Sequence, residues 1–295
     1  MTKVSLQSLN IIDKAGFVAA LGDIYEHAPW VAEAVAGQRP FATLAALHEA
    51  MMATVRAVPT QRQLALINGH PDLAGKAARA GTMTTESVAE QASAGLDRLS
   101  EAEFARFHHL NDAYRAKFGI PFIVCVRRHS KDSILRQFER RLPNDATTET
   151  TTALAEIFRI VALRLDQRLE AADRLPVHGR LSTHVLDTHG GHPAAGVTIE
   201  LVELSANGEQ RTIVKTTTNG DGRTDQPLIG GRPLPIGTYE LRFHVGAYFA
   251  RQRAPLADPA FLDLVPVRFA IAEPEGHYHV PLLVTPWSYA TYRGS

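Results

Sequence analysis

The chain has a single cysteine, Cys125, among its 295 residues. One cysteine excludes an intramolecular disulfide and fits a reducing compartment, so we expect a cytoplasmic protein. An excess of one charge sign is also missing, because basic and acidic residues both number 31. A nucleic-acid-binding surface normally needs a basic excess, so we expect no nucleic-acid partner.

Long apolar runs are equally missing from the sequence. No uninterrupted apolar stretch reaches the roughly 20 residues that span a bilayer, so we expect no membrane partner. The opening MTKVSLQSLNIIDKAG breaks every apolar stretch with polar residues and has no small-residue cleavage pattern, unlike a signal peptide. Hydrophobic residues still make up 45% of the chain, enough for a buried core. The length favours two domains.

Apolar residues recur at helical spacing through the first half of the chain. One helix is predicted to begin after Ser100, with Glu103 placed for a capping box, and to end at Gly119. A last helix is predicted over about 151–172. The apolar run PFIVCV, residues 121–126, predicts a buried extended segment. We therefore predict an all-α helical bundle over residues 1–172.

The pattern changes to that of short strands near residue 175. Segments rich in Val, Ile, Thr and Tyr alternate with Gly, Pro and Asn clusters, and Asn207-Gly208 and 219–222 are hairpin signals. This spacing predicts an all-β sandwich over residues 177–295. The expected strands cover residues 179–188, 197–204, 211–218, 239–245, 267–271 and 279–283.

Three histidines and an arginine carry possible chemistry in the β half. His184 lies on the strand face opposite Leu181, Thr183 and Val185. Read singly, such a histidine, or Arg223 after a turn, is typical of a structural or solvated residue. His277 and His279 share a strand face, so a metal site is conceivable, but zinc catalysis needs three protein ligands and no third is apparent. We expect no metal.

Taken together, four motifs of the β half resemble 5-hydroxyisourate hydrolase, the transthyretin-related enzyme. They are STHVLDTHGGHPAAGV, GDGRTD, HYHVPLL and the terminal YRGS. The resemblance implies a transthyretin-like sandwich assembled as a tetramer, with catalytic groups at His184, Arg223 and His279. Tyr292 and Ser295 would line the site. A transthyretin-like carrier of a hydrophobic ligand is the alternative, but an apolar channel has no use for these residues.

These residue types suit a ring-opening hydrolysis. A neutral histidine can take a proton from water near physiological pH. A guanidinium can orient a planar polar substrate and stabilise negative charge on oxygen. The sequence does not decide which histidine is the base, although His277 is less favoured because it lies nearer the strand start.

In the helical half, the sequence patterns that could indicate a site are less specific. His70 precedes Pro71, which favours an extended backbone at His70 and suits Pro71 to the first position of a helix. Ser87, Glu90 and Gln91 share one helix face at spacing i, i+3 and i+4, opposite an apolar face that includes Val88. In isolation these patterns are typical of a loop entering a helix and of a solvated polar face.

In this order along the chain, EHAPWVAE, GHPDLAGKAA, SVAEQASAGL and FGIPFIVCVR resemble 2-oxo-4-hydroxy-4-carboxy-5-ureidoimidazoline (OHCU) decarboxylase. The resemblance implies an all-α, dimeric enzyme that uses no metal and no organic cofactor. It places His70 as the catalytic acid/base with Glu90 beside it. The implied substrate contacts are Pro71, Ser87, Gln91, Phe122, Ile123, Val124, Cys125, Val126 and Arg164, although the residue type and apolar surroundings of Cys125 favour packing.

The two resemblances support each other because the hydrolase makes the substrate of the decarboxylase. We therefore predict a homo-oligomeric enzyme of urate catabolism that acts on small molecules and yields (S)-allantoin. The alternative that only one domain is active remains open, although no expected residue is missing.

Overall fold

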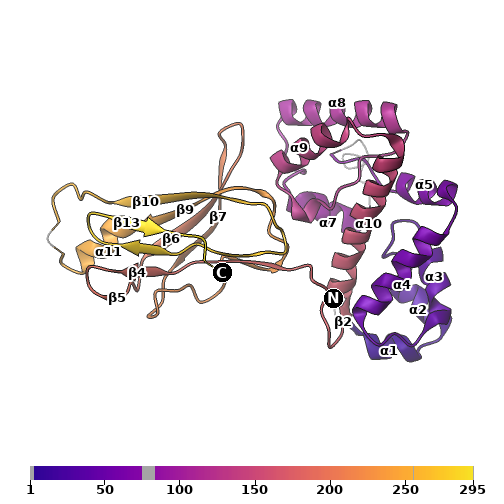
Figure 1. Ribbon diagram of the computed structural model, residues 1–295, viewed down its shortest axis with the longest axis horizontal. Helices are drawn as coiled ribbons and strands as arrows, with labels where there is room; N and C mark the ends of the chain where they lie inside the picture. The colour runs from indigo at the N-terminus through magenta and orange to yellow at the C-terminus, as the bar shows by residue number, and fades with distance from the viewer. Residues whose placement is uncertain (1–2, 75–83, 255, 295) are drawn as a thin grey trace. The chain divides into compact units, whose positions relative to one another are not determined.

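The computed structural model describes residues 3–74, 84–254 and 256–294, and it divides into two compact units (Figure 1). The first unit combines Met1–Arg127 with Ser133–Val177, and the second combines Arg128–Asp132 with His178–Ser295. Each unit encloses its own hydrophobic core. The boundary drawn from the sequence near residue 175 stays a prediction.

The first unit is helical, as predicted. Two short strands, β1 (Val4–Ser5) and β2 (Leu169–Glu170), pair in parallel beside the helices. The helices are α1 (Leu6–Ile11), α2 (Lys14–Leu21), α3 (Trp30–Val35), η1 (Ala36–Gln38), α4 (Leu44–Ala57), α5 (Thr60–Asn68), α7 (Thr85–Ser93), α8 (Glu101–Phe118), η2 (Val126–Arg128), α9 (Lys131–Arg141) and α10 (Ala146–Arg168).

Local signals set the ends of the long helices. Ser100 and Glu103 form the predicted capping box of α8, and Gly119 ends the helix in the left-handed region at φ +68°. The last helix, α10, begins at Ala146, earlier than predicted, because the Asp145 side chain caps its first turn. Residues 121–126 are buried as predicted, but they form no β-strand.

The second unit is a β-sandwich. One sheet has the order β10-β9-β6-β7, and the remaining strands form sheets of order β11-β3-β8 and β13-β12-β4-β5. Its elements are β3 (Gly179–Ser182), β4 (Val185–Asp187), β5 (His192–Pro193), β6 (Thr198–Leu204), β7 (Gln210–Thr217), β8 (Ile229–Arg232), β9 (Gly237–His244), α11 (Val245–Arg251), β10 (Leu264–Ile271), β11 (His277–His279), β12 (Leu282–Val284) and β13 (Tyr289–Thr291).

The predicted first strand, 179–188, is interrupted in the structure. Its two parts, β3 and β4, belong to different sheets and pair with β11 and β12, respectively. The predicted alternation of the side chains between two faces is nevertheless confirmed, because Leu181, Thr183 and Val185 are buried and His184 lies on the other face. The interruption leaves His184 between two strands. In the described part of the chain, no helix is long and apolar enough to cross a membrane.

Candidate active sites

His70 follows the end of α5 and is almost fully buried in the helical unit. Its Nδ1 lies 3.0 Å from the carbonyl oxygen of Leu66. Because a carbonyl can only accept, Nδ1 carries the proton and Nε2 of the neutral ring keeps a lone pair. Burial lowers the pKa of His70 to about 4, although Leu66 and the nearby Glu26 carboxylate oppose the shift. At neutral pH His70 is therefore a proton acceptor.

The segment that follows His70 differs from the prediction. Pro71 does not begin a helix over residues 71–74, and residues 75–83 lie outside the described part of the chain. The Gln91 side chain explains the difference, because its Oε1 accepts the backbone N–H of Ala74 at 2.9 Å. A backbone donor used in this way holds the segment as a turn against α7.

The polar face of α7 is buried. Ser87 and Gln91 are each 6% exposed, whereas Val88 on the opposite face is 46% exposed. The interpretation of this face as solvated is therefore wrong. Ser87 Oγ donates to Glu26 Oε1 at 3.1 Å, so the polar face meets polar partners inside the unit.

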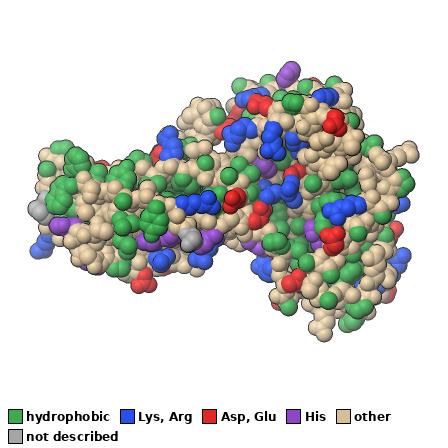
Figure 2. All heavy atoms as spheres, in the orientation of Figure 1, with side chains coloured by type: hydrophobic (Ala, Val, Ile, Leu, Met, Phe, Trp, Pro, Cys, Tyr) green, Lys and Arg blue, Asp and Glu red, His purple; other side chains and the backbone are tan. Residues whose placement is uncertain are grey.

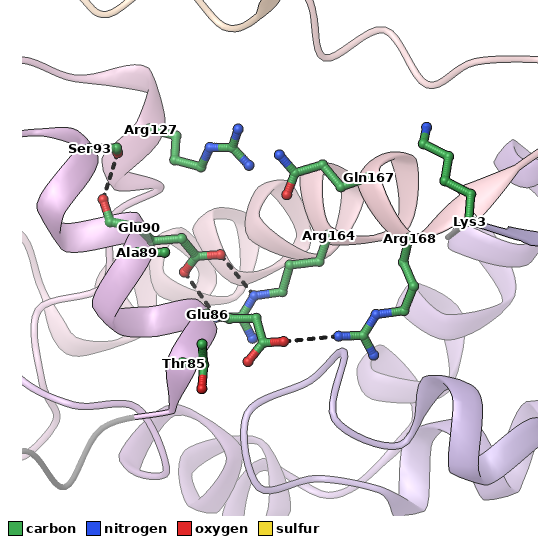
Figure 3. A pocket seen from close by; sticks show the side chains of 10 residues that line it. All are labelled: Lys3, Thr85, Glu86, Ala89, Glu90, Ser93, Arg127, Arg164, Gln167 and Arg168. Carbon is green, nitrogen blue, oxygen red and sulfur yellow. Dashed lines mark hydrogen bonds and ion pairs between the residues drawn. The ribbon is translucent and has the colours of Figure 1, made fainter. Parts of the chain in front are cut away.

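Arg164 on α10 lies between two carboxylates. Its Nε and Nη2 each donate to one oxygen of Glu90 at 2.9 Å, and its Nη1 donates to Glu26 Oε2 at 3.0 Å. Burial opposes the charge of Arg164, but Glu90 and then Glu26 raise its pKa. Burial likewise opposes the charge of Glu26, yet the Thr84 hydroxyl and Arg164 lower its pKa. Figure 3 shows the forked contact with Glu90.

These bonds limit what Arg164 can offer a substrate. Its Nη1 also donates to the Ile24 carbonyl at 3.3 Å, so these bonds use four donors of a guanidinium that has five. The geometry of Arg164 fits the role of positioning Glu90 and Glu26 better than the role of binding the substrate.

Most of the predicted decarboxylase residues line one cavity, but His70 and Arg164 are not among its lining residues. Cys125 packs in the core beside this cavity, and its backbone N–H donates to Glu156 Oε2 at 2.8 Å. The cavity is lined by Pro71, Leu73, Ser87, Glu90, Gln91, Phe122, Ile123, Val124, Val126 and Ile160.

Sequence reasoning missed Glu26, Thr84 and Asn111 in this unit. Glu26 joins Ser87 to Arg164, and Asn111 Nδ2 donates to the Leu73 carbonyl at 2.7 Å. Glu26 stands within a quoted motif, but no spacing links it to residues so far along the chain. Its one signal was a carboxylate among apolar neighbours.

The β-sandwich brings together His184, Arg223 and His279, as predicted. Isolated backbone bridges pair His184 with Arg223 and His279 with Gly294. The Asn219 side chain sets up the approach of Arg223 by accepting its backbone N–H at 3.2 Å. The turn also needs Gly222, at φ +69°, because a Cβ there would lie 2.3 Å from the Val185 carbonyl oxygen.

The two histidines form a chain of hydrogen bonds with Ser182, which sequence reasoning did not select. His184 Nδ1 lies 2.7 Å from His279 Nε2, and His279 Nδ1 lies 2.9 Å from Ser182 Oγ. Burial and then the Arg223 guanidinium lower the pKa of His184. Burial, followed by the charges of His184 and Arg223, lowers the pKa of His279. Both rings are therefore neutral at physiological pH.

The remaining groups around this site are more exposed. The Arg223 guanidinium makes no hydrogen bond or ion pair with any described residue, so it is available to a ligand. His277 lies 3.5 Å from Ser182 Oγ, and the Tyr292 side chain is exposed. Ser295 lies outside the described residues.

The described residues contain no cluster of three or more His, Cys, Asp or Glu side chains placed for a metal ion.

The helical unit has a buried histidine and a buried carboxylate–arginine network beside a cavity, and the β-sandwich has a histidine–histidine–arginine cluster. Together they define a two-domain enzyme with one polar site in each domain. The family model for OHCU decarboxylase matches residues 10–166, and that for the HIUase/transthyretin family matches residues 181–294. The chain belongs to both families, the first through its helical part and the second through its β part.

Relatives of each half, and one of the whole chain, agree with this assignment. A 2-oxo-4-hydroxy-4-carboxy-5-ureidoimidazoline decarboxylase of Halalkalicoccus jeotgali is 44% identical over 57% of this chain and 93% of its own length. The 5-hydroxyisourate hydrolase 2 of Rhizobium meliloti is 55% identical over 40% of this chain and 97% of its own. The crystal structure of an (S)-allantoin synthase is 35% identical, with a TM-score of 0.52, and covers 99% of this chain and 100% of its own.

Proposed function

We propose that this chain performs two consecutive steps of urate catabolism. Its β-sandwich hydrolyses 5-hydroxyisourate to OHCU, and its helical unit decarboxylates OHCU to (S)-allantoin. The observation that carries the proposal is the presence of both polar sites in one chain whose whole length is similar to an (S)-allantoin synthase. The substrates are small molecules, and the product of the first site is the substrate of the second.

In the hydrolase site, the hydrogen bonds support His184 as the general base. Both nitrogens of His279 and Nδ1 of His184 are hydrogen-bonded, which leaves His184 Nε2 for water. When Ser182 accepts from His279 and His279 accepts from His184, Nε2 is unprotonated and can take a proton from the attacking water. The Arg223 guanidinium then stabilises the negative charge that develops on the carbonyl oxygen.

In the decarboxylase site, His70 Nε2 accepts the proton of the substrate hydroxyl as CO₂ leaves. The electron pair of the broken bond is delocalised onto a ring nitrogen, which takes a proton from solvent, and His70 returns the hydroxyl proton to the neighbouring ring carbon. Protonation from one side gives a single enantiomer. The ring and its ureido group are held in one orientation by Ser87, Gln91, Phe122, Ile123, Val124 and Val126.

For the assembly, we propose a homo-oligomer with tetramer contacts through the β-sandwich and dimer contacts through the helical unit. The exposed aromatic side chains of Trp287, Tyr289 and Tyr292 support a contact surface near the C-terminal strand. A cytoplasmic location also remains a proposal, supported by the single buried cysteine.

The function is tested by supplying the purified chain with urate and urate oxidase. We expect the absorbance of hydroxyisourate to decay faster than it does spontaneously, and the allantoin formed to be the S enantiomer in excess. Chirality-resolved chromatography of the product measures the second step. Racemic allantoin formed at the spontaneous rate would contradict the proposal.

The acid side of the hydrolase pH profile should depend on Arg223. Only neutral His184 acts as a base, and the nearby cation helps to lower its pKa, so Arg223→Gln should raise that pKa. The acid limb of kcat/KM should therefore move to higher pH, with a loss of about 10²-fold at the plateau from the missing oxyanion contact. Stopped-flow absorbance between pH 5 and 8 checks the shift, which the exposed Arg211→Gln should not produce.

A further inference from the structure

The helical unit contains a second, larger cavity of about 660 Å³ beside the decarboxylase cavity. Residues of α7 and α10 form two of its sides, and Lys3 and Arg127 complete it (Figure 3). Glu90 lines both cavities. The larger cavity therefore lies against the Glu90–Arg164 pair and shares Glu90 with the cavity that Ser87 and Gln91 line.

The charges that line the larger cavity are not balanced. Its cations are Lys3, Arg127, Arg164 and Arg168, and its anions are Glu86 and Glu90. Glu90 is paired with Arg164, and Glu86 with Arg168 at 3.1 Å. Two cations are left over.

Neither of these two cations has a carboxylate partner within the described residues. Lys3 Nζ donates to the backbone carbonyl of Asp166 at 2.8 Å, and half-buried Arg127 makes no hydrogen bond or ion pair with a described residue. Figure 3 shows the Arg127 guanidinium and the Gln167 amide pointing toward each other across the cavity. A partly desolvated cation without a partner favours an anionic ligand.

We propose that this cavity is an antechamber that binds the carboxylated ureide before it enters the decarboxylase cavity. The inference rests on the proposed function. The Arg127 fork suits a carboxylate, the Gln167 amide can pair with ureido groups, and the volume is that of a small-molecule site. Arg164 is already paired with Glu26 and Glu90, and Arg168 with Asp23 and Glu86, so neither competes with Arg127 for the carboxylate.

The test replaces Arg127 in the full chain. Arg127→Gln should raise KM for OHCU about tenfold and leave kcat within about twofold, because it removes an entry contact and no reacting group. Arg127→Lys should restore most of the loss. Arg136→Gln is the matched control, since Arg136 is exposed on α9, also lacks a partner among the described residues and lines neither cavity.

A binding measurement separates this proposal from the proposed function. Hydantoin-5-acetate, a stable carboxylate on a five-membered ureide ring, is titrated calorimetrically into the unchanged chain, Arg127→Gln and Arg136→Gln. We expect about tenfold weaker binding for Arg127→Gln alone. Equal affinity for the two variants, or an unchanged KM, would overturn the antechamber. If Arg127→Gln weakened binding but the unchanged chain did not decarboxylate OHCU, the proposed function would be wrong and the anion site would stand.

Discussion

Replacing His70 by asparagine is expected to lower kcat/KM for OHCU decarboxylation by about 10³-fold and to leave hydroxyisourate hydrolysis unchanged. A positioned acid/base contributes about 10²–10⁴-fold to rate, and His70 is the buried imidazole whose Nδ1 is tied to Leu66 with Nε2 free. Asparagine keeps a polar side chain at the site but cannot exchange the proton. The product should become racemic allantoin, which chirality-resolved chromatography measures.

A second histidine of the same unit provides the matched control. His48 Nε2 lies 3.0 Å from the Phe158 carbonyl, and burial lowers the pKa of His48 as well. Neither ring lines either cavity, but His70 directly precedes Pro71 of the decarboxylase cavity and lies near Glu26, whereas no chain neighbour of His48 lines either cavity. His48→Asn should therefore retain decarboxylation and stereospecificity. If His48→Asn lost as much activity as His70→Asn, or if His70→Asn also abolished hydrolysis, the division of labour between the units would be wrong.

The sequence predicts those parts of the fold whose causes are local. The capping box of Ser100 and Glu103 and the left-handed Gly119 involve neighbours within one turn, and all were found where predicted. Strand alternation correctly placed His184 opposite Leu181 and Val185 for the same reason. The interruption between β3 and β4 could not be predicted, because it depends on the partner strands.

The decarboxylase cavity shows where such reasoning stops. The face of α7 that carries Ser87 and Gln91 has the pattern of a solvated face, and only its partners make burial possible. Those partners, Glu26 and the backbone of Ala74, are brought there by the packing of the whole unit. A polar residue can be buried when its hydrogen bonds are satisfied, and the sequence alone does not reveal that.

In the hydrolase, the motifs identified the side chains but not the order in which they act. His184, Arg223 and His279 were selected together from the family resemblance, and the choice of base stayed open. The hydrogen bond to Ser182 supports our proposal that His184 is the base, because it uses the second nitrogen of His279 and leaves Nε2 of His184 as the open one. The pairing of β3 with β11 that creates this chain places Ser182 opposite His279, 97 positions away in the sequence.

If His184 is the base and His279 positions it, the losses of activity caused by substituting the two residues should not be additive in free energy. We expect His184→Asn to lower kcat/KM for hydroxyisourate by about 10³-fold, and His279→Asn by about 10²-fold through loss of the fixed tautomer. The double variant should match His184→Asn alone, because the contribution of His279 passes through the same ring at 2.7 Å. Decay of hydroxyisourate absorbance measures all three.

His277 offers a control on the same strand face. It lies 3.5 Å from Ser182 Oγ and is exposed, so His277→Asn should change kcat/KM by less than about threefold. Fully multiplicative losses in the double variant would mean that His184 and His279 act on the substrate independently. The chain of hydrogen bonds with Ser182 would then have no part in catalysis, and each imidazole would have to transfer a separate proton.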